Sequence, residues 1–428
     1  MGIPLHSCSL HSSAAATLVA SSSDLSQSSK WLRSYKPPIS SSRRSSNSRC
    51  EAAAARCLTY AGYGREQEQQ DAAYMRECVE LARQAIGHTS PNPMVGCVLV
   101  KEGKVVGRGF HPKAGQPHAE VFALREAGEL AENATAYVSL EPCNHFGRTP
   151  PCSAALVRSR VKRVVVGMID PNPKVAGSGV KTLQDAGIEV VVGVEEELCR
   201  NMNEVFIHHM CTNKPFVILR YSMSMDGGIL GSLGFNAAVP GSSYSRLLQE
   251  VDAVVVTDAA VYNDPVLLSS EPNAKQPLRV ILARFLFSLL SAPTMVLADQ
   301  SAWVTNYQST SMQDGKAMEH RLQARGVDVV MLEDLSLEQV LSVCYLQGAY
   351  SVLLDSRGPD LSGLENFLGQ HAVREDVVNK LVVNISPVLL GENRTGPGFC
   401  LGDDLLKLER VSTRVSGRDV IIEGYFPN

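Results

Sequence analysis

Four residues of this chain have the types and the spacing of a catalytic zinc site. His118 and Glu120 stand two residues apart, and Cys143 and Cys152 follow downstream. A catalytic zinc takes three protein ligands, leaves a fourth position open to water, and needs an acid/base group nearby. We therefore assign the imidazole of His118 and the thiols of Cys143 and Cys152 to zinc, and proton transfer to the unligated carboxylate of Glu120.

The order of these residues indicates a particular chemistry. An H-x-E motif followed by P-C and a second cysteine is typical of zinc enzymes that deaminate nucleobases. Zinc lowers the pKa of water toward ~7 and so supplies a nucleophile for the ring carbon that carries the amino group. Glu120 would then move the proton from the water to the leaving nitrogen. Two alternatives stay open: a closed structural zinc site with His145 as fourth ligand, and a core cluster without metal.

The elements around these residues alternate between helix and strand. Apolar residues at helical spacing predict a helix over Asp71–Gly87, and Thr135–Leu140 reads as a strand that leads into the cysteine segment. His118 precedes a predicted helix and Cys152 opens another; the field at a helix N-terminus favours thiolates. This alternation predicts a layered α/β domain over residues 68–212.

A second predicted domain spans residues 214–428 and also alternates strands with helices, whereas residues 1–60 differ from both. They are rich in serine and arginine, and Asp24 is the only acid before Glu51. This composition predicts a disordered transit peptide, and the abundance of serine favours the chloroplast (plastid stroma). A disordered tail without a targeting role has the same composition.

Composition and charge exclude several function classes. The chain has 428 residues and a formal net charge of −4, so it has no electrostatic footprint for nucleic acid. No apolar run reaches the ~18 residues that would suggest a membrane span. The 11 cysteines are scattered, which favours a reducing compartment over a disulfide framework. We expect a small-molecule partner, no nucleic acid and no membrane, and leave homo-oligomer formation open.

The cysteine segment resembles one enzyme family closely. Many zinc deaminases separate their two cysteines by only two residues, whereas eight residues intervene here. They form the P-C-x-H-x-G-R-T-P-P-C pattern of the riboflavin-biosynthesis deaminases. The resemblance includes further segments of the first domain, namely Ser90–Gly96, His111, Gly115–Glu120, Asp170–Pro173 and Val175–Gly179.

The resemblance implies a fold, a substrate and its contacts. It implies a cytidine-deaminase-like three-layer α/β/α domain that binds Zn²⁺. The substrate would be the pyrimidine ribose phosphate formed when the guanine ring of GTP is opened; its ring 2-amino group would become an oxo group. By their matching positions, Arg148 would contact the ribose phosphate, and the pyrimidine and ribose would be contacted by Asn92, His111, His145, Asp170 and Asn172.

The second domain has four segments of a family framework, Pro215–Val217, Ser224–Gly227, Asn263–Pro265 and Ser386–Gly391. By these segments it resembles the reductase half of the same bifunctional enzymes. That resemblance implies a dihydrofolate-reductase-like α/β fold that uses NADPH. Four sites depart from the family pattern: Arg220 replaces a lysine, Asp258-Ala259 replaces a small or glycine-rich turn, Asn263 replaces an acid, and Asp355–Gly358 replaces a Glu-Gly-Gly turn. A phosphate cradle needs glycines, and an aspartate there would repel an anion.

These departures predict a working deaminase joined to an inactive reductase-like domain. This is the arrangement of the plant, plastid-targeted branch of the family. Two alternatives remain: a bifunctional deaminase–reductase whose second domain uses NADPH, and a non-catalytic scaffold partner. A deaminase of bases in tRNA or DNA fits less well, because of the cysteine spacing and the negative net charge of the chain.

Overall fold

The computed structural model describes most of the chain after residue 63. The described residues are 64–146, 150–172, 175–234, 237–257, 260, 266–282, 301–305, 327–331, 336–357, 377–391 and 407–427. Within these ranges, no helix combines the length and the apolar character needed to cross a membrane. The predicted transit peptide, Arg148, Asp258, Ala259, Asn263 and Gly358 lie outside the described residues.

The first domain is built on a five-stranded sheet with the order β2-β1-β3-β4-β5. Its strands are β1 (Gly96–Lys101), β2 (Lys104–Phe110), β3 (Thr135–Val138), β4 (Arg163–Val166) and β5 (Glu189–Val192). Its helices are α2 (Arg65–Arg83), α3 (Ala119–Ala127), α4 (Cys152–Arg158), α5 (Ser178–Asp185), α6 (Glu196–Met202) and α7 (Glu204–Thr212). Strands β3, β4 and β5 run parallel, whereas β1 is antiparallel to both of its neighbours.

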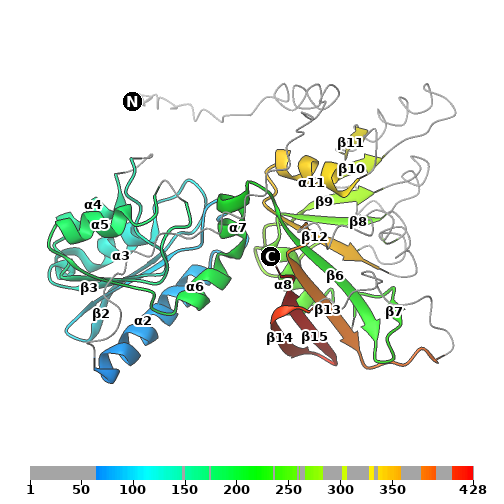
Figure 1. Cartoon of the computed structure of the whole chain (residues 1–428), viewed down its shortest axis with the longest axis horizontal. Coiled ribbons are helices and arrows are strands. Elements are labelled where there is room, and N and C mark those ends of the chain that lie inside the picture. Colours follow the sequence, from blue (N-terminus) through cyan, green and yellow to red (C-terminus); the bar gives the residue numbers. More distant parts are fainter. Residues whose placement is uncertain are drawn as a thin grey trace, which may run out of the picture. The chain divides into compact units, whose positions relative to one another are not determined.

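Helices cover both faces of this sheet, because its strands are apolar on both sides. Strand residues alternate between two cores: Cys97 and Leu99 pack with α3, α4 and α5, whereas Val98 and Val100 pack with α2 and α6. Figure 1 shows α3, α4 and α5 on one side of the sheet and α2 and α6 on the other. The predicted three-layer α/β/α architecture is thus confirmed.

The second domain is built on a ten-stranded mixed sheet. Its order is β11-β10-β9-β8-β12-β6-β13-β15-β14, and β7 pairs with β6. The strands are β6 (Phe216–Ser224), β7 (Ile229–Leu230), β8 (Ala253–Thr257), β9 (Leu278–Leu282), β10 (Ser301–Thr305), β11 (Val327–Met331), β12 (Ser351–Ser356), β13 (Lys380–Ser386), β14 (Glu409–Ser416) and β15 (Asp419–Tyr425). All pairs from β11 to β13 are parallel, and the β13-β15-β14 end is antiparallel.

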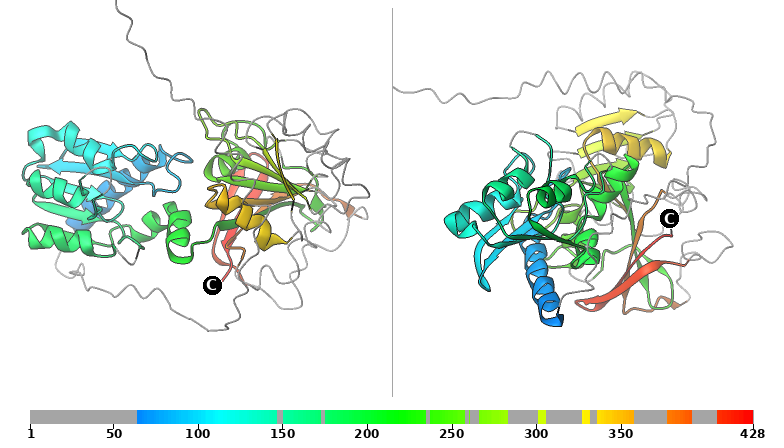
Figure 2. Two further views of the ribbon diagram at one scale, coloured as in Figure 1. Left: turned by 90° about the horizontal axis from the view of Figure 1, so that it is seen from above. Right: turned by 60° about the vertical axis from the view of Figure 1, so that its left-hand side comes forward.

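Two cores flank this second sheet as well. Along β6, Phe216 and Ile218 face the core that holds helix α8 (Ser243–Glu250), whereas Val217 and Leu219 face helix α11 (Leu337–Leu346). The two views in Figure 2 show the sheet with these helices. The parallel strands and their covering helices make this an α/β domain, as the sequence predicts.

The described elements differ from the sequence predictions mainly at their ends. Helix α2 begins at Arg65, whereas the apolar periodicity predicted a start at Asp71. Its first turns are polar and therefore carry no apolar signal. Asp71 itself is buried and forms an ion pair with Arg163 of β4 at 2.7 Å, so this helix is tied to the sheet by charge as well as by apolar packing.

Candidate metal centre and active site

Three segments of the first domain meet at one edge of its sheet. Cys143 follows the carboxyl end of β3, and Asp170 follows the carboxyl end of β4. Because β3 and β4 are parallel neighbours, the two loops leave the sheet side by side, which is where open α/β sheets bind ligands. His118 lies at the N-cap of α3, and Cys152 is the first residue of α4.

Helix α3, which carries Glu120, lies unusually close to strand β2. A Cβ atom added at Gly109 would come within 2.2 Å of the Ala119 carbonyl oxygen, and one added at Gly107 within 2.2 Å of that of Ala123. The helix presents small alanines to the strand, and the strand presents glycines to the helix. This close packing of α3 on β2 determines how far His118 and Glu120 lie from the sheet.

The three predicted metal ligands lie together. The ligand atoms of His118, Cys143 and Cys152 are all within 4.8 Å of one another. The Nδ1 atom of His118 is 3.5 Å from the Cys143 Sγ and 3.4 Å from the Cys152 Sγ. Tetrahedral zinc with bonds of ~2.1 Å to nitrogen and ~2.3 Å to sulfur places such atoms about 3.6 Å apart. The donor set and its dimensions therefore fit Zn²⁺.

No fourth protein ligand joins this cluster within the part of the chain that the structure describes. His145, the fourth ligand that a closed structural site would need, is exposed and lies outside the group. Three ligands and an open position are the arrangement of catalytic zinc. The described geometry therefore favours the catalytic alternative over the closed one.

The charges around the cluster suit metal binding and proton transfer. Hydrogen bonds with Cys152 and His118 lower the pKa of the Cys143 thiol, whereas the hydrogen bond with Cys143 and burial raise the pKa of the Cys152 thiol. Burial raises the pKa of the Glu120 carboxyl to about 7, and Cys143 adds to the rise. Glu120 is 3% exposed and is hydrogen-bonded to Cys152. It therefore lies beside the cluster without belonging to it.

Asn92 and His111 form a second group beside the cluster. The Asn92 Nδ2 atom lies 3.1 Å from the His111 Nε2 atom, and His111 Nδ1 lies 3.1 Å from the Pro117 carbonyl oxygen. A carbonyl can only accept, so His111 carries its proton on Nδ1 and Nε2 accepts from Asn92. Burial lowers the pKa of His111. Its ring packs edge-on against the ring of His118, with 5.5 Å between the two ring centroids.

Asp170 and Asn172 lie on the loop that follows β4. The Asp170 Oδ1 atom accepts a hydrogen bond of 2.9 Å from the Asn172 backbone N–H. Burial raises the pKa of the Asp170 carboxyl, and His145 acts on it in the opposite direction. The structure thus brings Asp170, Asn172 and His145 to the same edge of the sheet as the cysteines, whereas Arg148 lies outside the described residues. The substrate contacts assigned to these residues stay predictions.

One acidic residue of this region was not singled out by the sequence. Glu141 directly precedes Pro142-Cys143, and its buried carboxylate accepts hydrogen bonds from the backbone of the Asp170 loop and of α5. Its place next to a metal ligand was the available signal. Spacing alone, however, does not reveal a partner some 30 to 40 residues away.

In the second domain, three of the described residues that depart from the family pattern, Arg220, Asp355 and Arg357, form one buried network. Arg220 donates to Asp355 at 3.1 Å, and Arg357 donates to the same carboxylate at 2.8 Å. The Tyr244 hydroxyl also donates to Asp355, at 2.8 Å. The sequence suggested an aspartate that repels anions. That expectation is wrong, because two guanidinium groups neutralise Asp355.

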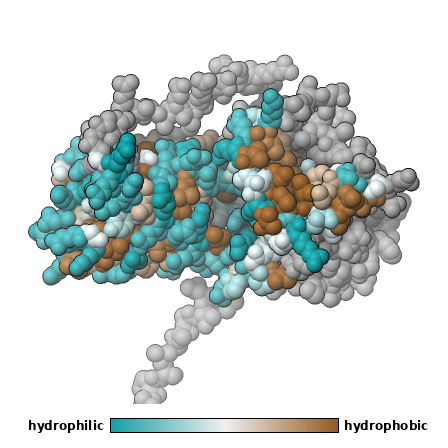
Figure 3. Space-filling view, turned by 90° about the horizontal axis from the view of Figure 1, so that it is seen from below, coloured by the Kyte–Doolittle hydropathy of each residue, from teal (hydrophilic) through white to brown (hydrophobic). Residues whose placement is uncertain are grey.

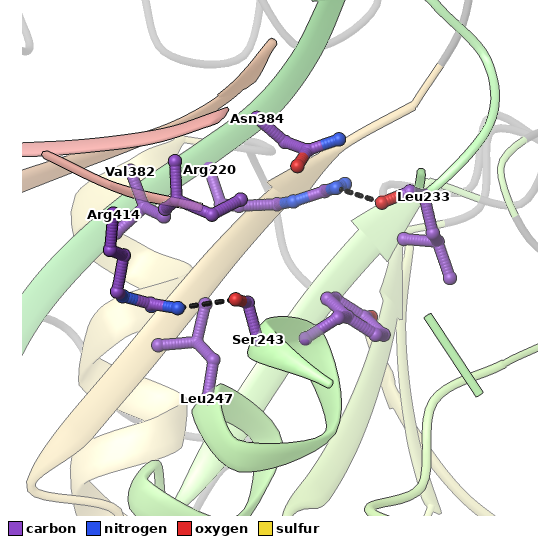
Figure 4. A pocket seen from close by; sticks show the side chains of 9 residues that line it. Arg220, Leu233, Ser243, Leu247, Val382, Asn384 and Arg414 are labelled. Atoms are coloured by element: carbon purple, nitrogen blue, oxygen red, sulfur yellow. Dashed lines mark hydrogen bonds between the residues drawn. The ribbon is translucent and has the colours of Figure 1, made fainter. Parts of the chain in front are cut away.

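Next to this network lies a cavity of about 20 Å³. Figure 4 shows two of its lining arginines, Arg220, which donates to the Leu233 carbonyl oxygen, and Arg414, which donates to the Ser243 hydroxyl. A cavity of this size is large enough to hold a water molecule.

Comparison with known proteins agrees with this description. The family model of the cytidine and deoxycytidylate deaminase zinc-binding region matches residues 68–168, and that of the RibD C-terminal domain matches residues 215–422. The chloroplastic riboflavin biosynthesis protein PYRD of Arabidopsis thaliana is 46% identical over 365 residues, which are 84% of each chain.

Two solved structures are similar along their whole length. Acinetobacter baumannii RibD is 34% identical with a TM-score of 0.69, and covers 84% of this chain and 100% of its own. A Thermotoga maritima protein covers the same shares, with 28% identity and a TM-score of 0.68. This protein is named a diaminohydroxyphosphoribosylaminopyrimidine deaminase/5-amino-6-(5-phosphoribosylamino)uracil reductase.

Fold and site together define a zinc-dependent deaminase domain followed by a reductase-like domain. The chain belongs to the RibD family of riboflavin-biosynthesis proteins. The predictions of this family, of a hydrolytic deaminase and of a zinc cofactor are confirmed. The chloroplastic naming of plant relatives likewise confirms the expected plastid location.

Proposed function

We propose that this chain deaminates 2,5-diamino-6-ribosylamino-4(3H)-pyrimidinone 5′-phosphate. Water replaces the ring amino group, so that 5-amino-6-ribosylaminouracil 5′-phosphate and ammonia are formed. The observation that carries the proposal is the cluster of His118, Cys143 and Cys152 with Glu120 buried beside it. The name of the Thermotoga maritima relative contains the same class of substrate, a diaminohydroxyphosphoribosylaminopyrimidine.

Metal binding and proton transfer are assigned to different residues. His118, Cys143 and Cys152 would hold the zinc ion, which when bound supplies a water of lowered pKa as the nucleophile. Glu120 takes one proton of that water and passes it to the ring nitrogen, and then moves the second proton to the leaving amino nitrogen, which departs as ammonia. Its burial supports this role, because a carboxyl with a pKa of about 7 can both accept and donate a proton near neutral pH.

The remaining site residues would hold the substrate. We assign pyrimidine and ribose contacts to Asn92, His111, His145, Asp170 and Asn172, and the 5′-phosphate to Arg148. Support comes from the loops that carry the described members, which reach the metal centre from β4 and from the segment before β1. Arg148 would bind the phosphate through its guanidinium, which offers two parallel donors.

We further propose the division of the chain that the sequence predicts. Residues 1–60 form the transit peptide, residues 68–212 the deaminase domain, and residues 214–428 a reductase-like domain without reductase activity. The buried Arg220–Asp355–Arg357 network supports the last point, because it fills the region where the family pattern has glycines.

Ammonia release by the purified full chain tests the deaminase. Zinc-loaded protein should release ammonia from the pyrimidine substrate, and the product should lack one amino group by mass spectrometry. Absence of ammonia from protein that carries zinc would contradict the proposal and would leave the scaffold alternative.

The same preparation tests the second domain. The uracil product and NADPH are added, and NADPH oxidation is followed at 340 nm, with a bifunctional RibD protein as the positive control. We expect no reduction by this chain. Steady NADPH oxidation would instead establish the bifunctional alternative.

Self-association is the remaining part of the proposal. Strand β14 is an edge of the described sheet, and the register partners Val415 and Val420 are both exposed. Figure 3 shows apolar residues gathered on one face of the second domain. Exposed edge strands pair readily with another copy. Val415→Lys should therefore reduce the mass seen by analytical ultracentrifugation; a monomeric wild type would contradict this part.

A further inference from the structure

Glu141 is a buried carboxylate that binds four backbone N–H groups. Its Oε2 atom accepts from Asp170 at 3.1 Å and from Gly177 at 3.0 Å, and its Oε1 atom accepts from Gly179 at 2.8 Å and from Val180 at 3.3 Å. The residue is 3% exposed. Because both oxygens accept from backbone donors, Glu141 ties together the segments that carry these donors.

The four donors lie at the two ends of one loop. Asp170 opens the loop after β4, and Gly177 to Val180 close it and begin α5. Helix α5 has no side-chain cap of its own, since its N-cap is Gly177. Glu141 satisfies the N–H groups of its first turn from another segment of the chain, as an N-cap side chain would. One carboxylate therefore holds both ends of the loop.

Two further contacts hold the same segments together. A Cβ atom added at Gly179 would lie 2.1 Å from the Pro142 carbonyl oxygen, so only glycine allows this approach. The Asn144 Nδ2 atom donates to the Ser178 carbonyl oxygen at 3.2 Å, and its Oδ1 atom accepts from the Ser153 hydroxyl at 2.7 Å. The start of α5 is thus attached to the residues on both sides of Cys143 and to α4.

We propose that Glu141 is a positioning residue for the deamination. It fixes the loop that carries Asp170 and Asn172 at a set distance from the segment that carries Cys143, and so determines how tightly the substrate binds. The inference rests on the proposed function. A misplacement of about 1 Å can cost about 100-fold in catalysis, so a shift of this loop on that scale is measurable.

Glu141→Gln is the direct test. The side chain keeps its size, but an amide N–H₂ group replaces one oxygen and faces two backbone donors. We expect KM for the pyrimidine substrate to rise about 10- to 100-fold while zinc content stays at one ion per chain. Hydrogen exchange of the Gly177, Gly179 and Val180 amides should become faster, a readout that needs no activity. The matched control is Glu132→Gln, at an exposed ion pair.

Gly179→Ala tests the same contact without a change of charge, and also serves if Glu141→Gln folds poorly. The added methyl group must push α5 away from Pro142, so KM should rise again. Gly64→Ala is its control, because nothing lies within 4 Å of a Cβ atom there.

The outcomes separate the two proposals. An unchanged KM in both variants, with or without lower thermal stability, overturns the positioning role and leaves Glu141 as a structural cap. A wild type that carries zinc but releases no ammonia contradicts the proposed function instead. In that case, faster hydrogen exchange of the loop amides in Glu141→Gln would still show that Glu141 holds the loop in place.

Discussion

Arg220 and Asp355 are register partners on the parallel strands β6 and β12, and their side chains form an ion pair of 3.1 Å. Neither side chain is more than 3% exposed. Arg357 binds the same carboxylate, and Tyr244 donates to it. Among the described residues, Arg220, Tyr244 and Arg357 are therefore all bound to the Asp355 carboxylate.

Asp355→Asn should destabilise the protein strongly. Removing one partner from a buried ion pair leaves an uncompensated charge and costs about 3–5 kcal/mol. In this variant Arg220 and Arg357 would face each other without the carboxylate that separates them. Urea unfolding of the full chain measures the loss, with the exposed Asp185→Asn as matched control. Equal unfolding midpoints for the two variants would contradict the network's role in stability.

The same network predicts a dependence of stability on pH. Burial alone would raise the pKa of Asp355, but Arg357 and Arg220 outweigh it and hold the pKa below its ordinary value. Unfolding restores a pKa near ~3.9, so the carboxylate stabilises the fold fully above about pH 4. The contribution is lost as the pH falls through the lower folded pKa. The stability difference between wild type and Asp355→Asn should accordingly shrink below pH 4; a difference that grows on acidification would contradict the assignment.

The sequence predicted those parts of the site that a local motif encodes. His118, Glu120, Cys143 and Cys152 are recognisable because their types, order and flanking residues are tied to one chemistry, and the structure brings the three ligands together. Most strands and helices of the first domain were also predictable, since apolar periodicity reports directly on burial. Helix α2 shows the limit, because its polar first turns have no such signal.

Contacts between segments that are distant along the chain could not be predicted from the sequence. Glu141 looks like an ordinary polar residue until β3 and β4 are known to be parallel neighbours, which brings the Asp170 loop to its carboxylate. Arg357 reads as a surface charge, yet its side chain is fully buried against Asp355 and Tyr244. In both cases topology decides the partner, and no spacing along the chain contains that information.

Glu120→Gln should separate metal binding from catalysis. The amide keeps the size of the side chain but cannot take a proton from water, so ammonia release should fall about 10²- to 10⁴-fold. Zinc content should stay unchanged, because Glu120 is not among the three ligand residues. Elemental analysis and an ammonia assay on the same sample decide the matter. Retained turnover would remove Glu120 from the mechanism, and loss of zinc would make it part of the metal site.

Cys143→Ala should remove both metal and activity. Two ligands remain, and since partners outside the metal shell already cost 10- to 100-fold in affinity or activity, loss of a ligand should cost more than about 100-fold. Dialysis against a chelator should reproduce the loss in the wild type, and added zinc should restore activity to the wild type but not to the variant. Cys211→Ala, at an exposed cysteine of α7, is the control and should behave as wild type. Activity that survives in metal-free Cys143→Ala would show that the cluster does not carry the reaction.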